Sequence, residues 1–180
     1  IDALKVLKKS INKNFDKAVN TIVNCQSKII LCGVGKSGLI AAKIASTLSS
    51  VGSPAFSLSA NDCLHGDLGS ITRKDILILI SNSGKSEEII PIIKFANRNK
   101  VKLIGIVSKK NSFLYKGSDI KILLPEVKES GLGVVPTSST SIQLAIGDAL
   151  AVAALKKKQF SKYDFSRLHP GGTLGKQLKT

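Results

Sequence analysis

The sequence predicts a doubly wound α/β fold, a three-layer sandwich in which helices cover both faces of a five-stranded parallel sheet. Five short apolar runs alternate along the chain with segments whose apolar residues recur every three or four positions. Such alternation indicates βαβ units, whose successive strands lie parallel. The length of 180 residues, of which 43% are hydrophobic, is sufficient for one domain with an ordinary core.

The first half of the chain supplies two of the five strands. Residues 3–24 are predicted to form one amphipathic helix, because apolar residues recur at helical spacing: Leu4, Val6, Leu7, Ile11, Phe15, Val19 and Ile22. The apolar run 28–34 has a glycine near its end, Gly33, as expected of a buried strand. A helix over 37–50 and a turn at Ser53 and Pro54 then lead to a second strand over 55–58.

The second half supplies the other three strands. The run Asp75–Ile80 is unbroken by polar residues after Asp75, which is typical of a strand buried on both faces. A helix is predicted over 86–99, followed by strands over 101–107 and 120–124. A long helix is predicted over 139–157, and the remaining tail is expected to be a loop with short helical turns.

The net charge of +15 comes from 27 basic and 12 acidic residues, and it raises nucleic-acid binding as a hypothesis. Base and phosphate recognition favour arginine, however, and only Arg73, Arg98 and Arg167 are arginines. The lysines are scattered, apart from residues 156–158. We therefore interpret the charge as a solvated surface that also attracts an anionic metabolite, and we expect no nucleic-acid partner.

The cysteines and the hydropathy pattern indicate the cellular compartment in which the protein is expected. Cys25, Cys32 and Cys63 are odd in number and lack C-x-x-C spacing, which argues against a disulfide framework or a zinc site. No apolar run reaches the roughly 20 residues that cross a bilayer, and the sequence does not begin with a secretory leader. We expect a soluble, cytoplasmic protein that does not engage a membrane.

Three loops follow predicted strands, where ligands of such folds bind. The first, Gly33–Gly38, reads G-x-G-x-x-G and contains Gly-Lys-Ser, so nucleotide sites must be considered. No acid follows the second strand before Asp62 to hold a ribose, and Ile30 stands where a P-loop needs glycine. The glycines alternatively serve only a tight turn between strand and helix.

The second loop, Ser81–Ser86, carries three hydroxyls and a glycine before a predicted helix. Free N–H groups and the helix dipole attract anions, and hydroxyls add neutral donors, so this loop is suited to a phosphate monoester. The alternative is a plain helix cap, with Ser86 as N-cap and Glu87 and Glu88 in the first turn. One serine is enough for a cap, so three favour the phosphate.

The third loop, 136–141, is rich in Ser and Thr and again precedes a helix. Its hydroxyls add to the same phosphate site or cap the long helix, and the sequence leaves both possibilities open.

Together with two further blocks, these loops resemble the SIS (sugar isomerase) domains, specifically those of the arabinose-5-phosphate isomerase group. The two blocks are His65-Gly66-Asp67-Leu68-Gly69 and His169-Pro170-Gly171-Gly172-Thr173-Leu174-Gly175. The resemblance runs from about residue 20 to residue 178, with the five motifs in family order. One departure lies at 129–133, where relatives carry a slightly longer segment that contains Cys-Pro.

The resemblance implies interconversion of D-ribulose 5-phosphate and D-arabinose 5-phosphate, which supplies the sugar Kdo for lipopolysaccharide or capsule. It further implies a homotetramer with sites at subunit boundaries. Longer members append two CBS domains, so we expect residues 1–180 to be a single SIS domain with an N-terminal helix and no CBS domain.

Isomerisation through a cis-enediol needs a base that moves a proton between C1 and C2, and requires no metal or organic cofactor. Matching to the family motifs implies the catalytic candidates Lys36, Glu88, Glu129, His169 and His65. Glu88 (or, less favoured, Glu87) and Glu129 form the acid/base pair, and His169 shuttles hydroxyl protons. Lys36 neutralises the enediolate or the phosphate. His65 forms a second wall of the site, either in its own subunit or in a neighbouring one. The phosphate-binding candidates are Ser37, Ser81, Ser83, Ser86, Ser139 and Thr140. Which carboxylate takes the C2 proton stays open.

Three other functions compete with this interpretation. A non-catalytic sugar-phosphate sensor is disfavoured because DNA-binding regulators with SIS domains carry a helix-turn-helix, and only about 27 residues precede the first strand. A nucleotide-binding Rossmann domain is disfavoured by the missing ribose acid. An SIS isomerase for another phosphosugar, such as a hexose phosphate, is disfavoured by the motif blocks.

Overall fold

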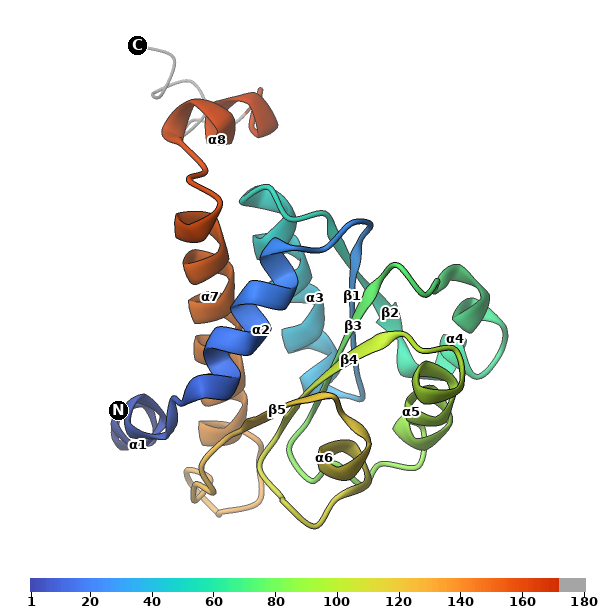
Figure 1. The fold of residues 1–180 in the computed structure, drawn as a ribbon. Coiled ribbons are helices and arrows are strands. Elements are labelled where there is room, and N and C mark those ends of the chain that lie inside the picture. Colours follow the sequence, from blue (N-terminus) through green and yellow to red (C-terminus); the bar gives the residue numbers. More distant parts are fainter. Residues whose placement is uncertain (172–180) are drawn as a thin grey trace.

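The computed structural model describes residues 1–171, which contain a five-stranded sheet covered by helices on both faces (Figure 1). The strands are β1 (Ile29–Gly33), β2 (Ala55–Ser59), β3 (Ile76–Ser81), β4 (Lys102–Val107) and β5 (Ile120–Leu123). They pair in the order β2-β1-β3-β4-β5, and every pair is parallel. The predicted doubly wound sandwich and all five predicted strands are confirmed.

The helices form two layers. One face is covered by α1 (Asp2–Ser10), α2 (Lys13–Val23), α3 (Lys36–Ser50) and α7 (Ser138–Lys157). The other face is covered by α4 (Ala60–Cys63), α5 (Ile89–Arg98) and α6 (Phe113–Gly117). The short 3-10 helix η1 (Asp67–Ser70) follows α4, and α8 (Lys162–Leu168) lies beyond the end of α7.

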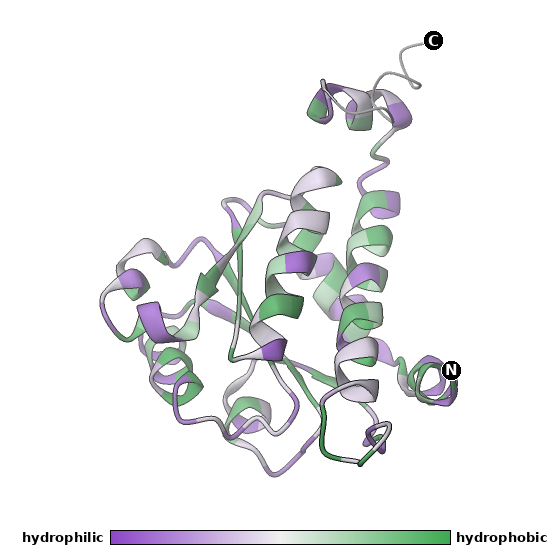
Figure 2. Ribbon diagram, turned by 180° about the vertical axis from the view of Figure 1, so that it is seen from behind, coloured by the Kyte–Doolittle hydropathy of each residue, from purple (hydrophilic) through white to green (hydrophobic). Residues whose placement is uncertain are grey.

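Alternate residues of the strands point into two separate cores, because successive side chains of a strand face opposite sides. Along β3, Ile76, Ile78 and Ile80 pack towards α3 and α7, whereas Leu77 and Leu79 pack towards α5. All six residues of β3 are buried, which explains its unbroken apolar sequence. In Figure 2 the strands are accordingly coloured hydrophobic along most of their length.

The predicted single helix over 3–24 is wrong. The chain forms α1 and α2, with a break at Ile11 and Asn12. Asn12 is extended and its Oδ1 accepts a hydrogen bond from the Asn14 N–H (2.9 Å), so it is the N-cap of α2. Apolar periodicity continues across the break, and therefore did not reveal it; asparagine, which competes for backbone hydrogen bonds, was the available signal.

Two further expectations need correction. The helix predicted to begin at Ser86 begins at Ile89, so Ser86 is not its N-cap. The long helix α7 is apolar and long enough to cross a membrane by length and composition, contrary to the expectation from the sequence. It packs against α1, α2 and α3, and Ile142, Ile146 and Leu150 are buried in the core, as in the central helix of a globular domain.

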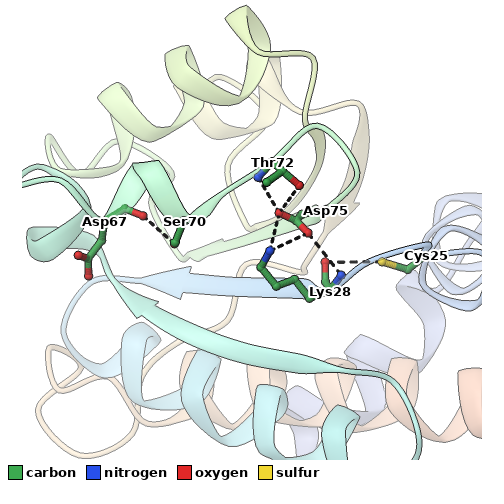
Figure 3. Close-up of polar contacts among 6 residues, drawn as sticks. All are labelled: Cys25, Lys28, Asp67, Ser70, Thr72 and Asp75. Atoms are coloured by element: carbon green, nitrogen blue, oxygen red, sulfur yellow. Dashed lines mark hydrogen bonds and ion pairs between the residues drawn. The ribbon is translucent and has the colours of Figure 1, made fainter.

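The beginnings of β1 and β3 are tied together by a buried carboxylate (Figure 3). Asp75 is 1% exposed and accepts hydrogen bonds from Lys28 Nζ (3.0 Å), the Thr72 N–H (2.6 Å) and the Thr72 hydroxyl (2.9 Å). Burial alone would raise the pKa of Asp75, but hydrogen bonds from Ser27, Thr72 and Lys28 lower it to about 2. The carboxylate therefore stabilises the fold in its ionised form.

This tether predicts a pH-dependent stability. The pKa of Asp75 is lower in the folded chain than its ordinary value of 3.8, so its contribution is complete above that pH and is lost as the pH falls towards 2. We expect Asp75→Asn to lower the free energy of unfolding by about 2 kcal/mol at pH 7, as measured by urea denaturation. The difference from wild type should shrink between pH 4 and pH 2.

The exposed pair of Asp2 with Lys5 offers a matched control. Asp2→Asn should change stability by less than about 0.5 kcal/mol, since exposed ion pairs contribute little. A loss for Asp75→Asn that is the same at every pH would contradict the ionised tether.

Candidate functional site

A cleft of about 390 Å³ opens where the three predicted loops meet, at the carboxyl ends of β1 and β3 and the start of α7. Its walls are Val34, Lys36, Ser37, Asn82, Glu129, Val134, Pro136, Ser139, Thr140 and Gln143. A larger cavity of about 510 Å³ lies on the other side of the β3–α5 loop, beside β5. We place the site in the smaller cleft, because only there do residues of all three predicted loops converge.

The glycines of the first loop allow β1 and α3 to approach closely. A Cβ on Gly33 would lie 2.8 Å from the Ser37 carbonyl carbon, and one on Gly38 would lie 2.8 Å from the Gly33 oxygen. Gly35 has φ +55°, a left-handed conformation that favours glycine. The motif thus serves the turn from strand to helix, and that turn places Lys36 and Ser37 in the first turn of α3 at the cleft.

The hydroxyls of the second loop shape its backbone. Ser81 Oγ accepts from the Gly84 N–H (3.0 Å), and Ser83 Oγ accepts from the Lys85 N–H (3.3 Å). Asn82 borders the cleft, and its Oδ1 accepts from the Ser108 hydroxyl (2.7 Å). Because the two serine oxygens act as acceptors in these bonds, their protons stay free to be donated to an anion.

The segment before α7 places the carboxylate of Glu129 against the backbone amides at the start of that helix. Glu129 Oε2 accepts from the Thr137 N–H (2.9 Å), the Ser139 N–H (3.1 Å) and the Thr137 hydroxyl (3.3 Å). Partial burial would raise the pKa of Glu129, but hydrogen bonds from Ser139 and Thr137 lower it below its usual value. An ionised carboxylate therefore caps α7 at the wall of the cleft, where the helix dipole favours it.

This arrangement bears on the two possibilities left open for the third loop. The Thr140 hydroxyl donates to the Thr137 oxygen (2.9 Å), within the first turn of α7. The N–H groups of Thr137 and Ser139 bind Glu129. The loop therefore acts as a cap of α7, and Ser139 and Thr140 also line the cleft.

Gln143 is a cleft residue that the sequence analysis missed. Its side chain has 0% exposure, and its Oε1 accepts from the Ser37 hydroxyl (3.1 Å). Its Nε2 is buried and finds no hydrogen-bond partner among residues 1–171, which costs about 1–3 kcal/mol. The available signals were an amide between Ile142 and Leu144 in an apolar run, and its position one turn after Ser139. Asn82 was also missed, although it lies within the second motif.

Several predicted residues lie elsewhere in the chain. Glu88 is the half-buried residue preceding α5, Glu87 is exposed, and His65 is exposed on the turn after α4. None of the three lines the cleft, and neither do the predicted phosphate-binding residues Ser81, Ser83 and Ser86; Ser83 lines the larger cavity beside β5. Within residues 1–171, no group of three or more His, Cys, Asp or Glu side chains is placed to hold a metal ion.

His169 lies at the opposite end of α7 from Glu129. It follows α8, stacks on Phe165 with ring centroids 3.8 Å apart, and its Nδ1 is 2.8 Å from the Phe165 oxygen. Because α7 has 20 residues, its two ends are about 30 Å apart, and Figure 1 shows α8 beyond the end farther from the cleft. One chain therefore does not bring His169 to Glu129. Residues 172–175 of the His169 motif lie outside the described part of the chain.

Known proteins match this chain over nearly its whole length. Residues 22–153 match the SIS domain. The chain is 44% identical over 178 residues to the arabinose 5-phosphate isomerase KdsD of Yersinia pestis, a match that covers 98% of this chain and 54% of that protein. The chain thus spans about half the length of the curated relatives it matches.

Two solved structures are also similar. Escherichia coli CFT073 c3406, solved in complex with arabinose 5-phosphate, has a TM-score of 0.87 and 35% identity, covering 93% of this chain and 92% of that one. The putative phosphosugar isomerase involved in capsule formation from Bacteroides fragilis has a TM-score of 0.87 and 34% identity, covering 95% of each chain.

The cap on α7 predicts a role for Glu129 in stability that is separate from any chemistry. We expect Glu129→Ala to lower the free energy of unfolding by about 1 kcal/mol at pH 7, because two amide groups of α7 lose their acceptor. Because folding lowers the pKa of Glu129, the difference in stability between wild type and Glu129→Ala should have its full size above the usual carboxyl pKa. It should shrink as the pH falls below that value. Urea denaturation at pH 7 and at pH 3 measures both.

The matched control is Glu126→Ala, which removes an exposed carboxylate paired with Lys109 near the same loop. It should cost less than about 0.5 kcal/mol. Equal effects of the two substitutions would refute the capping role.

Proposed function

The chain belongs to the SIS-domain family, and from this premise we propose that it is a sugar-phosphate isomerase that interconverts D-ribulose 5-phosphate and D-arabinose 5-phosphate. The observation that carries the proposal is the ionised carboxylate of Glu129 in a cleft that also presents Lys36 and Ser37. The 44% identity to the Yersinia pestis isomerase and the 35% identity to a protein solved with arabinose 5-phosphate support a pentose phosphate as substrate.

The residues of the cleft supply the tools for an enediol mechanism. The phosphate binds in the cleft beside the loop 81–86, whose Asn82 forms part of the cleft wall. Glu129 takes the proton from one of the carbons C1 and C2 and returns it to the other through the cis-enediol. The ammonium group of Lys36, at the N-terminus of α3, stabilises the negative charge that develops on the enediolate oxygen.

Between the two candidate carboxylates, the cleft favours Glu129 as the base. Glu129 lines the cleft and is held by defined hydrogen bonds, whereas Glu88 lies at the start of α5. We assign Glu88 a supporting electrostatic role near the phosphate loop, since its charge lies two residues after Ser86.

We further propose that the enzyme is a homotetramer whose sites lie at subunit boundaries, so that His169 and His65 enter the site of a neighbouring copy. Exposed apolar side chains surround the cleft, as expected of a surface that a partner covers. Leu39 on α3 is 73% exposed, and Leu132 and Val134 in the loop before α7 are 89% and 74% exposed. Figure 2 shows this loop coloured hydrophobic over part of its length.

The wider role is likewise a proposal. We place the reaction in the cytoplasm, where its product supplies Kdo for lipopolysaccharide or capsule, and we assign residues 1–180 to a single SIS domain. The continuous five-stranded sheet with its two cores supports one domain for the described residues.

Turnover of D-ribulose 5-phosphate tests the reaction. We expect the metal-free wild-type protein to form D-arabinose 5-phosphate. Glu129→Gln should lower kcat by about 100- to 10,000-fold with little change in KM, because the general base is lost while the phosphate contacts stay. Full activity in a folded Glu129→Gln variant would remove Glu129 from the chemistry. Tight binding without turnover in wild type would favour a sugar-phosphate sensor.

Mixing inactive variants tests the shared site. Glu129→Gln and His169→Ala should each be nearly inactive alone. When they are unfolded together and refolded as mixed tetramers, about a quarter of the sites regain both wild-type residues, and activity should return in proportion. Mixtures of Glu129→Gln with Lys36→Ala, both on the same cleft wall, are the control and should stay inactive. No recovery in the first mixture would place His169 outside the site.

A further inference from the structure

Among the buried side-chain nitrogen and oxygen atoms of residues 1–171, only Nε2 of Gln143 has no hydrogen-bond partner, and Gln143 lies in the wall of the cleft. Gln143 is fully buried on α7, so bulk water does not satisfy its Nε2. Buried amides in folded proteins are nearly always paired, so an unpaired buried donor in the wall of a cleft is a candidate for binding an acceptor atom of a ligand.

The pairing of the amide oxygen decides what that ligand atom must be. The Ser37 hydroxyl donates its single proton to Gln143 Oε1 (3.1 Å). This bond uses the Ser37 proton and pairs the amide oxygen, so the atom left without a partner is Nε2, which carries only N–H donors. The partner must therefore be an acceptor, and the group richest in acceptors on a sugar phosphate is the phosphate itself.

We propose that Gln143 is a substrate-binding residue whose Nε2 donates a hydrogen bond to the phosphate group of the sugar phosphate. The inference rests on the proposed function for the identity of the ligand. Ser37, which was predicted to bind the phosphate, then acts as a positioning residue, because its hydroxyl holds the amide oxygen of Gln143. A neutral amide suits this place, because Glu129 and Lys36 already set the charge of the cleft.

Two substitutions separate binding from folding. Gln143→Glu keeps the shape and the acceptor for Ser37 but removes the donor, and Gln143→Met keeps the length without either polar group. Isothermal titration calorimetry with D-arabinose 5-phosphate and with inorganic phosphate should show Kd values raised about 10- to 100-fold for both ligands in both variants. In turnover, KM should rise by a similar factor while kcat changes less than threefold.

The thermal midpoint of the ligand-free protein distinguishes a binding role from a structural one. Gln143→Met removes the unpaired donor, so its Tm should equal or exceed that of wild type. A lowered Tm with unchanged affinity for both ligands would make Gln143 merely structural and overturn the inference. The control Gln26→Met changes an exposed glutamine at the opposite edge of the sheet and should leave Kd and Tm unchanged.

The remaining outcomes are also decisive. A raised Kd for D-arabinose 5-phosphate with an unchanged Kd for inorganic phosphate would place Nε2 on the sugar and overturn the phosphate assignment. If wild type binds both ligands without turnover, the isomerase proposal fails while the Kd values still support or refute the role of Gln143. If wild type turns over and the variants bind normally, the inference fails alone. Binding of neither ligand by wild type would overturn it as well.

Discussion

An all-parallel sheet must be covered on both faces, and this constraint generates the rest of the structure. All six residues of β3 are buried, with one alternate set facing α3 and α7 and the other facing α5. The crossover after β1 leaves through α3 to one face, and the crossover after β3 leaves through α5 to the other. The two loops therefore diverge at the carboxyl edge, and the cleft opens between them. The position of the site follows from the winding of the sheet.

Glu129 meets two demands that oppose each other. Hydrogen bonds from the amides of Thr137 and Ser139 stabilise the carboxylate and lower its pKa. The same bonds make it a weaker base, and a general base works best with a pKa near the working pH. A substrate that draws the carboxylate away from α7 would raise its basicity and release two amides that can bind oxygen atoms of the ligand. In the proposed mechanism, substrate binding and activation of Glu129 as the base are then coupled through the start of α7.

The sequence predicted those features that local chemistry determines. Strands such as β3 were legible because burial on both faces requires an unbroken apolar run, and the three loops followed from the fold class. The break at Asn12 was not legible, because apolar periodicity continues across it. The break depends on one residue, Asn12, whose side chain caps the start of α2. Gln143 was overlooked because its importance depends on which donor stays unpaired once α3 and α7 have packed. The separation of His169 from Glu129 was not legible because it depends on the length and direction of α7, which a motif match does not contain.

The features that are unfavourable to the stability of this chain are concentrated around one cleft. The buried donor of Gln143 is unpaired within the described residues, and Leu39, Leu132 and Val134 expose apolar surface to water. Each of these is unfavourable in an isolated, ligand-free chain, and natural sequences keep such local conflicts mainly where function compensates for them. The two kinds of cost call for two kinds of partner. A buried donor requires an acceptor small enough to enter the cleft, whereas exposed apolar side chains require a second protein surface. The proposed site, completed by both a phosphorylated sugar and a neighbouring copy, satisfies the two together, which a site within a single chain does not.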